Sequence, residues 1–366
     1  MNYIPPTLPL PPEIETKAVL KKLSKAHQAL AELKGVTGVI PNHSILVNTL
    51  SLQEAKDSSA IENIVTTHDE LFISDFMKRQ FVTLASKEVH SYALALRNGF
   101  DTVKQTQLLT NSCILTIQET LLENNAGYRK LPGTALKNDY TGETIYMPPQ
   151  ETHLIENLMA NLEQFINDES MSDLDPLVKM AIIHHQFESI HPFYDGNGRT
   201  GRIINILYLV KMGLLTSPVL YLSRYINQNK HAYYHLLQSV RDTNDWQPFI
   251  MYILDGVEQT SRQTTRLVQD IRELMQAHKE KIRTQLPKIY SQELLNNLFS
   301  HPYTKIEFVM KELDARRKTA AKYLDQLVDI GLLNKQQVKK ENYYVNQDLF
   351  DLLLNVGTQS LRISDS

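Results

Sequence analysis

One twelve-residue segment gathers side chains that can handle phosphate. Residues 191–202 read HPFYDGNGRTGR. His191 titrates near neutral pH and can accept a proton from a hydroxyl group. Asp195 supplies a hard oxygen of the kind that holds Mg²⁺ beside phosphates. Arg199 and Arg202 are three residues apart, so they share one face if a helix begins at this point.

The backbone of the same segment can also donate hydrogen bonds to an anion. Gly196 and Gly198 allow N–H groups to approach a ligand closely, and Asn197 suits a tight turn and can donate to an oxygen. The N-terminus of the helix that follows adds a partial positive charge. His191 alone would more often be structural, but together these residues predict a phosphate-handling site.

Three other kinds of site are excluded by the pattern. Gly196, Gly198 and Gly201 match G-x-G-x-x-G, but a dinucleotide-binding loop should follow a β-strand, and here a helix precedes it. No G-K-[ST] sequence occurs, which excludes a Walker A loop. His184 and His185 do not form H-E-x-x-H, so we expect partly buried helix residues rather than zinc ligands.

Two helices must position this segment. Residues 176–190 have a clear helix start, with Asp175 as N-cap and Pro176 in the first turn. Residues 199–212 are apolar nearly all round, as in a buried central helix, and Gly213 is expected to end it.

Further helical patterns surround this pair. Gly35 and Gly99 are expected to end the first and third of them. Residues 127–150 instead predict a short β-hairpin between helices. The other helices are expected at residues 14–34, 51–64, 69–98, 106–124, 151–168, 230–242 and 246–284.

The last segment has a different plan. Short helices at 291–299, 305–313 and 316–330 precede two strands around the turn KKEN, which predicts a winged helix-turn-helix. A basic group at the start of the third helix fits DNA phosphates, but nearby acidic residues dilute it and winged helices also bind proteins, so both functions stay open. The candidate DNA contacts are Arg316, Arg317, Lys318 and Lys322, with Lys335, Lys339 and Lys340 in the wing.

Composition limits the remaining choices. The 366 residues carry 38 basic and 41 acidic side chains, a balance that argues against a surface built as a whole for DNA or anionic membranes. Cys113 is the single cysteine, which excludes internal disulfides and a thiolate zinc site. The sequence has no secretory signal and no apolar run of about 20 residues, so we expect a cytoplasmic protein that does not enter the membrane. Five prolines in the first twelve residues predict extended chain, either a disordered tail or a strap across the body.

Residues 191–202 match the Fic motif HPFx(D/E)GN(G/K)RxxR at every fixed position, and the preceding HHQFESI resembles the family's helix. The hairpin at 127–148 resembles the Fic flap, and the chain resembles Fic proteins over roughly residues 1–255. The resemblance implies a mainly α fold, with a Fic-type helical core, a β-hairpin flap and a C-terminal winged helix-turn-helix domain. The expected divisions are an N-terminal helical region (1–105), the Fic core (106–255), a connecting helix (256–286) and the winged-helix domain (287–366).

The resemblance also implies an activity, the transfer of AMP from Mg-ATP to a Ser, Thr or Tyr hydroxyl of a protein target, including the chain itself. His191 would be the general base, and Asp195 would hold Mg²⁺, or Mn²⁺ in its place. Asn197 would contact the α-phosphate, Arg199 the outer phosphates and Arg202 the γ-phosphate. The implied ATP-binding residues are Glu62, Asp195, Gly196, Asn197, Gly198, Arg199, Thr200, Gly201, Arg202, Tyr233, Tyr234 and Arg241, and the implied target-docking residues of the flap are Gly133, Thr134, Ala135 and Leu136.

Residues 58–63, SSAIEN, resemble the inhibitory motif (S/T)xxxE(G/N) of the same family, on a helix at about 51–64. Ser58 and Glu62 lie one turn apart and share a face, and Asn63 completes the motif. The resemblance implies that Glu62 pairs with Arg202 and displaces the γ-phosphate, and that the protein forms a homodimer. Two alternatives stay open: removal of AMP from a modified protein at the same site, and transcription regulation by a DNA-binding protein with a Fic fold.

Overall fold

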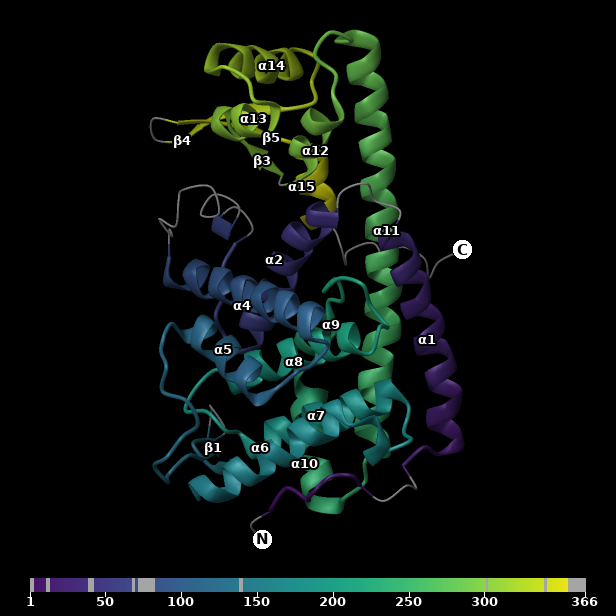
Figure 1. Ribbon diagram of the computed structural model, residues 1–366, viewed down its shortest axis with the longest axis vertical. Helices are drawn as coiled ribbons and strands as arrows, with labels where there is room; N and C mark the ends of the chain where they lie inside the picture. The colour runs from purple at the N-terminus through teal and green to yellow at the C-terminus, as the bar shows by residue number, and fades with distance from the viewer. Residues whose placement is uncertain are drawn as a thin grey trace.

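Two consecutive helices, α7 (Pro176–Ile190) and α8 (Asn197–Lys211), form the buried centre of the fold. Figure 1 shows them at the middle of a helical body, with a smaller C-terminal domain at the upper end of the molecule. The predicted helix over 176–190 is confirmed. The computed structural model describes residues 3–10, 14–38, 43–67, 70–71, 83–137, 141–300, 302–338 and 341–354.

The starts of both helices follow from local sequence. The side chain of Asp175 accepts a hydrogen bond from the Leu177 N–H at 2.8 Å, and Pro176 occupies a position whose N–H would have no partner in the helix. Helix α8 begins two residues before its predicted start, because Gly196 has a left-handed φ of 76° and turns the chain into the helix.

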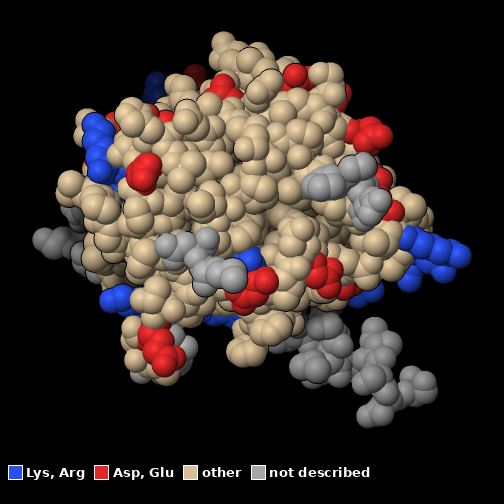
Figure 2. All heavy atoms as spheres, turned by 90° about the horizontal axis from the view of Figure 1, so that it is seen from below, with Lys and Arg blue, Asp and Glu red and all other residues tan. Residues whose placement is uncertain are grey.

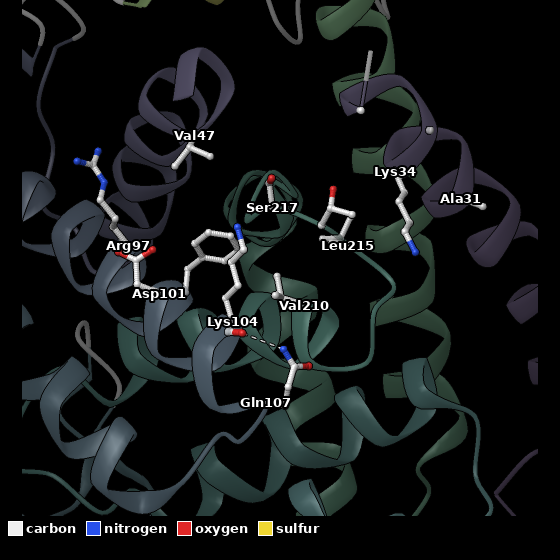
Figure 3. A pocket seen from close by; sticks show the side chains of 14 residues that line it. Ala31, Lys34, Val47, Arg97, Asp101, Lys104, Gln107, Val210, Leu215 and Ser217 are labelled. Carbon is white, nitrogen blue, oxygen red and sulfur yellow. Dashed lines mark hydrogen bonds between the residues drawn. The ribbon is translucent and has the colours of Figure 1, made fainter. Parts of the chain in front are cut away.

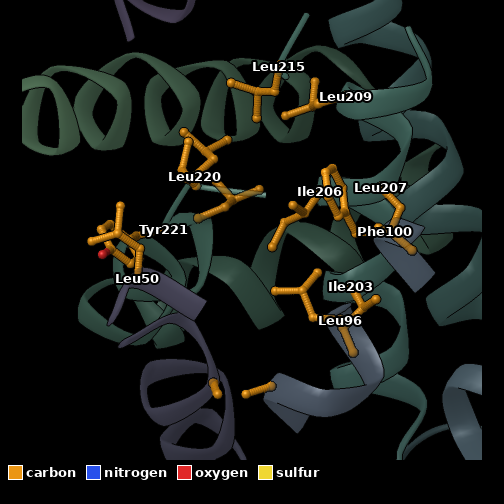
Figure 4. Packing of buried hydrophobic residues seen from close by; sticks show 14 of the residues in the cluster. Leu50, Leu96, Phe100, Ile203, Ile206, Leu207, Leu209, Leu215, Leu220 and Tyr221 are labelled. Carbon is orange, nitrogen blue, oxygen red and sulfur yellow. The ribbon is translucent and has the colours of Figure 1, made fainter. Parts of the chain in front are cut away.

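Helix α4 (Leu84–Thr106) packs directly on α8, and its predicted end at Gly99 is wrong. A Cβ atom on Gly99 would lie 2.6 Å from the Cδ1 of Leu207, so this glycine allows the two helices to approach closely. Leu96 and Phe100 of α4 join the buried apolar cluster around α8 (Figure 4). Gly99 is therefore a packing residue rather than a helix end.

The two N-terminal helices also differ from their predicted bounds. Helix α1 (Lys17–Thr37) continues past Gly35, where an end was expected, and packs along the long helix α11 (Gln247–Gln285). Helix α2 (His43–Ile61) begins eight residues before its predicted start at residue 51. Tertiary packing of the apolar faces outweighs the modest cost of one glycine inside α1.

The remaining helices of the body agree with the sequence except at their ends. The helix expected over 106–124 begins only at Asn111, because the Thr110 side chain accepts from the Cys113 N–H and caps it. The start of the helix expected over 69–98 falls partly on residues 72–82, which lie outside the described residues. Helix α9 was not expected. The bounds are α5 (Asn111–Leu122), α6 (Thr152–Asn167), the 3₁₀ helix η1 (Glu169–Met171), α9 (Leu222–Gln228) and α10 (Lys230–Thr243).

The proline-rich segment is a strap rather than a tail over the residues 3–10 that the structure describes. The Leu8 N–H donates to Oδ1 of Asn161 on α6 at 2.8 Å, and the Asn161 amide donates to the Leu8 carbonyl at 2.9 Å. The Pro6 carbonyl accepts from the Gln186 side chain of α7 at 2.7 Å. Figure 2 shows the molecule from the end where this strap lies: uncharged residues form most of the face, and charged side chains lie mainly toward its edges.

The C-terminal domain contains the three helices and the hairpin that the sequence predicts, plus two elements that it does not, β3 and α15. Its three strands form an antiparallel sheet in the order β3-β5-β4. Lys339 and Lys340, expected in the wing, lie outside the described residues. The bounds are α12 (Gln292–Ser300), β3 (Tyr303–Thr304), α13 (Ile306–Leu313), α14 (Arg317–Asp329), β4 (Asn334–Val338), β5 (Glu341–Val345) and α15 (Gln347–Leu354).

Helix α2 lies between this domain and the body. It packs against α12 on one side and against α4, α8 and α9 on the others. None of the helices in the described parts of the chain is long and apolar enough to cross a membrane.

Candidate functional site

The loop between α7 and α8 is closed by its own side chains. His191 ends α7 with a left-handed φ of 49°, and its N–H bonds to the Phe187 carbonyl at 2.9 Å. The Asn197 amide donates to the Phe193 carbonyl at 2.8 Å and accepts from the Phe193 N–H at 2.9 Å. Both polar atoms of Asn197 are engaged with the loop backbone, so the structure gives this side chain a loop-closing role, and its contact with an α-phosphate stays a prediction.

The imidazole of His191 lies in a surrounding that keeps it neutral. Burial lowers the pKa of His191 to about 4, and the positive charges of Arg241 and Arg129 act in the same direction. A neutral imidazole at pH 7 has a lone pair free to accept a proton.

Arg129 lies at the entry of the hairpin that resembles the Fic flap, but sequence reasoning assigned it no role in the site. Its side chain is buried, its Nε donates to the His191 carbonyl at 2.9 Å, and its Nη2 donates to the Pro149 carbonyl. Its own N–H bonds to the Pro192 carbonyl at 2.9 Å. Arg129 thus fixes both ends of the flap to the loop that carries His191.

Arg199 and Asp195 lie together at the N-terminus of α8. The Asp195 side chain is 72% exposed, and its Oδ2 lies 3.7 Å from Arg199 Nη2. Arg199 is only 4% exposed, and its Nη1 bonds to Oε2 of Glu88 on α4 at 2.9 Å. The sequence did not point to Glu88, because 111 residues separate it from its partner.

Arg202 is bound through its Nε and Nη2 by the segment that precedes the core. Its Nε donates to Ser58 Oγ at 2.8 Å, and its Nη2 donates to the Ser58 carbonyl and to Glu62 Oε1, each at 2.9 Å. The structure therefore brings Ser58, Glu62 and Arg202 together, as the sequence predicts. Asn63 follows with a left-handed φ of 61°, just past the end of α2, and its side chain accepts from Lys230.

The Glu62 carboxylate is charged in this arrangement. Burial raises the pKa of Glu62, but the positive charge and hydrogen bond of Arg202, with the charge of Arg199, outweigh burial and lower it overall. A Cβ atom on Gly198 would collide with Glu62 Oε1 and would lie 2.9 Å from Arg202 Nη1. Gly198 therefore provides the space in which the carboxylate lies on α8.

Helix α2 is anchored by a second carboxyl group on the same face. Glu54, Ser58 and Glu62 follow one another at intervals of four residues; Glu54 and Ser58 are buried in α2, and Glu62 lies one residue past its end. Glu54 is buried and accepts from the Ser223 N–H at 3.2 Å, from the Ser223 hydroxyl and from the Tyr92 hydroxyl at 3.3 Å. Burial raises the pKa of Glu54 to about 7, although the Ser223 hydrogen bonds oppose this.

This shift predicts a pH-dependent contribution of Glu54 to stability. The folded protein keeps the Glu54 proton up to about pH 7, whereas the unfolded chain loses it near pH 4.5, so the stabilisation is complete below pH 4.5 and is lost as the pH rises through 7. Relative to Glu54→Gln, the wild-type free energy of unfolding should fall by about 3 kcal/mol between pH 4.5 and pH 8. Denaturant unfolding of both proteins across this range measures the difference, and a constant difference would contradict the assignment.

The three residues expected around adenine lie on α10 in different surroundings. The Tyr233 side chain is buried, and its hydroxyl is 2.8 Å from His184 Nε2, whereas Tyr234 is 46% exposed. The Arg241 guanidinium stacks 4.0 Å from the ring centre of Tyr146 in the flap and donates to Ser189 Oγ. Their contact with adenine stays a prediction.

Thr200 and Gly201 of the 191–202 segment are packed inside the site. Thr200 is buried in α8, and a Cβ atom on Gly201 would lie 2.7 Å from Glu188 Oε1. Burial raises the pKa of Glu188 to about 7. The two residues therefore bring α8 close to α7 rather than facing open space.

The predicted hairpin is confirmed, but its first strand does not include all four predicted docking residues. β1 (Leu136–Lys137) pairs antiparallel with β2 (Thr144–Tyr146). Of the four docking residues, only Leu136 is in the strand, and Ala135 precedes it directly. The Gln150 side chain accepts from the Gly133 N–H at 2.7 Å and donates to the Thr134 carbonyl at 2.9 Å, so it holds the flap in place.

A separate cavity of about 1080 Å³ opens between α1, α4 and the C-terminal end of α8 (Figure 3). Lys34, Arg97 and Lys104 line it with apolar side chains such as Phe100, and none of the predicted site residues reaches it. Within the described part of the chain, no group of three or more His, Cys, Asp or Glu side chains could hold a metal ion.

Three family models match the chain. Residues 20–101 match the N-terminal region of the Fic/DOC family, and residues 108–209 match the Fic/DOC family itself. These two regions make up half of the chain and contain all the residues around Arg202 described above. The chain belongs to the Fic/DOC family. Residues 274–349 match the C-terminal domain of protein adenylyltransferase SoFic-like, so this Fic/DOC chain also carries that domain.

Curated Fic relatives match over a shorter region. The protein adenylyltransferase Fic of Drosophila melanogaster is 36% identical over 103 residues, which are 28% of this chain and 20% of the relative. The corresponding protein of Drosophila willistoni is 34% identical over 141 residues, 37% of this chain and 27% of the relative. The chain thus matches only about a fifth to a quarter of the length of these proteins.

Solved structures extend the likeness to the whole fold. A Fic family protein from Desulfovibrio desulfuricans G20 has a TM-score of 0.57 and 19% identity, with 92% of this chain and 98% of that chain covered. Fic-1 (residues 134–508) of C. elegans has a TM-score of 0.52 and 19% identity, with 68% and 73% covered. At this level of identity the Fic fold is what the comparison shares.

Proposed function

We propose that this Fic/DOC protein transfers AMP from Mg-ATP to a Ser, Thr or Tyr hydroxyl of a protein, including itself. The observation that carries the proposal is the placement of neutral His191 beside the N-terminus of α8, where Arg199 and Arg202 are both buried. Thr200 donates the first hydrogen bond of this helix, to Gly196, so the three N–H groups before it are left for an anion. This is the charge pattern that a polyphosphate needs.

The residues have distinct tasks in the proposed reaction. His191 takes the proton of the target hydroxyl while the hydroxyl oxygen forms a bond to the α-phosphorus. The bond from that phosphorus to the bridging oxygen breaks, and pyrophosphate leaves with its electron pair. The α8 N-terminus and Arg199 stabilise the negative charge on the phosphates. The flap positions the target chain beside His191 by strand addition.

Asp195 is the residue that would hold the magnesium ion. Mg²⁺ bound with nucleotides commonly takes one or two protein carboxylates and fills its other positions with phosphate oxygens and water. A single carboxylate that is 72% exposed beside the α8 N-terminus fits this requirement. The ion would supply positive charge to the phosphates.

Glu62 supports autoinhibition as part of this proposal. Its carboxylate binds Arg202, which the γ-phosphate also needs, so ATP and Glu62 compete for one guanidinium. The homodimer stays a prediction of the family resemblance, and the cytoplasmic location stays a prediction of the sequence.

Radiolabelled ATP tests the proposed activity directly. Label in the α-phosphate should become bound to protein, whereas label in the γ-phosphate should not, because it leaves with pyrophosphate. Label transferred from the γ-position would indicate a kinase. Release of AMP from a premodified protein, without transfer, would favour the reverse, hydrolytic activity.

DNA binding by the C-terminal domain is a second proposal. Arg317 pairs with Glu307 at 3.1 Å and Lys335 pairs with Asp325 at 2.8 Å, which weakens the predicted patch. The start of α14 nevertheless exposes basic residues that have no ion-pair partner among the described residues. These are Arg316, Lys318 and Lys322.

Removal of these three charges should abolish binding to duplex DNA. The triple alanine variant of Arg316, Lys318 and Lys322 should give no mobility shift at low salt, whereas wild type should bind and lose affinity steeply as salt rises. A double alanine variant of the exposed Lys21 and Lys25 on α1 serves as a control of equal chemistry. Absence of binding by wild type would leave the domain a protein-binding module.

A further inference from the structure

Glu88 is a second carboxylate that binds an arginine of the 191–202 segment. Its Oε2 lies 2.9 Å from Nη1 of Arg199. Glu88 is 29% exposed and belongs to α4, which packs directly on α8, so its contact does not depend on α2. Each of the two arginines thus has its own carboxylate from a different segment of the chain.

The two ion pairs differ in which nitrogens of the guanidinium groups they use. Glu62 and Ser58 use both Nε and Nη2 of Arg202. Glu88 uses only Nη1 of Arg199. The Nε of Arg199 is buried and has no hydrogen-bond partner among the described residues.

The edge of Arg199 that Glu88 does not bind lies beside Asp195. Its Nη2 is 3.7 Å from Oδ2 of Asp195, the exposed carboxylate proposed to hold magnesium. The Nε and Nη2 donors form one side of the planar guanidinium, and that side can bind two oxygens of a phosphate in parallel. A buried donor without a partner is costly, so this edge is suited to gain a ligand.

We propose that Glu88 is a positioning residue that holds Arg199 by Nη1 and presents its Nε and Nη2 edge to the outer phosphates of ATP. The inference rests on the proposed use of ATP. An arginine held in one rotamer before ATP arrives loses less conformational freedom on binding than a free one. Glu88 therefore acts in the opposite sense to Glu62, which competes with ATP for its arginine.

Binding of Mg-ATP and of AMP to the full chain, measured by calorimetry, tests this role. All proteins carry Glu62→Gly, so that the Glu62 carboxylate is removed from Arg202 in every case. Glu88→Ala should weaken ATP about five- to tenfold, the cost of one unrestrained side chain, and should change AMP less than twofold because AMP lacks outer phosphates. Glu88→Gln keeps an oxygen at the same reach and should restore most of the affinity.

The matched control removes a carboxylate from a neighbouring ion pair. Glu123 pairs with Lys87 on α4 at 2.6 Å, and Glu123→Gln should leave both affinities unchanged. Tighter ATP binding by Glu88→Ala would overturn the proposal and make Glu88 a competitor. Equal weakening of ATP and AMP, or no rescue by Glu88→Gln, would also overturn it.

Transfer is measured separately on the same proteins. If Glu88→Ala weakens ATP selectively but no variant labels protein, the positioning role stands and the proposed transferase function fails. If protein is labelled and ATP binding is insensitive to Glu88, the transferase function stands and the positioning role fails.

Discussion

Replacement of Glu62 by glycine should increase self-labelling from α-labelled ATP about 100-fold. The substitution removes the carboxylate from Arg202, which then can bind the γ-phosphate and align ATP for in-line attack. Misplacement of reacting groups by about 1 Å costs on the order of 10²-fold in rate, which sets the size of the expected gain. Initial rates at saturating Mg-ATP measure the effect.

Variants of the same pair separate competition from a general loosening of α2. Glu62→Asp should activate less, because a shorter carboxylate still reaches part of the guanidinium. Arg202→Ala should not activate, since it removes the γ-phosphate contact with the inhibitory one, and the double variant should behave like Arg202→Ala. If Glu62→Gly labels no faster than wild type, Glu62 is an ordinary carboxylate at a helix end.

Loss of the His191 imidazole should reduce AMP transfer by about 10²–10⁴-fold, the usual range for a general base. The effect is best measured in the Glu62→Gly protein, where the starting rate is expected to be high. ATP affinity should change little, because the proposed phosphate contacts come from α8 and not from the imidazole.

The backbone conformation of His191 determines which substitution tests its role with the least strain. His191 has a φ of 49°, a region that asparagine tolerates better than alanine, so His191→Asn tests the proton acceptor with less strain than His191→Ala. The exposed His231 on α10 provides the control, and His231→Ala should keep full activity. Undiminished labelling by His191→Asn would remove His191 from the proposed mechanism.

The parts of the fold that follow from local patterns were predictable. The start of α7 depends on Asp175 and Pro176, which are adjacent in sequence to the helix that they cap. Gly35 and Gly99 show the limit of this reasoning. Each resembles a helix end, but α1 and α4 continue through them because α11 and α8 supply the packing.

The contacts of the site likewise include some that the sequence predicted and some that it did not. The contact between Glu62 and Arg202 could be expected because family motifs mark both residues. Glu88 and Glu54 carry no local signal, and the flap resemblance marks Arg129 without its contacts, since their partners lie 111, 169 and 62 residues away. Such contacts depend on which helix faces lie together, and that information is absent from the spacing of residues within one segment.

The length of α11 limits which molecules can contact the C-terminal domain and the flap of one chain at the same time. Its 39 residues at 1.5 Å each make a rod about 58 Å long, which contacts α7 and α10 near one end and α12 and α15 near the other. Figure 1 shows the flap near the lower end of this rod and α14 at the upper end. A molecule docked on α14 therefore has to extend along much of this rod to bring a hydroxyl group to the flap of the same chain. Any molecule tethered by the C-terminal domain and modified by that chain must be elongated, or must offer its hydroxyl on a long flexible arm.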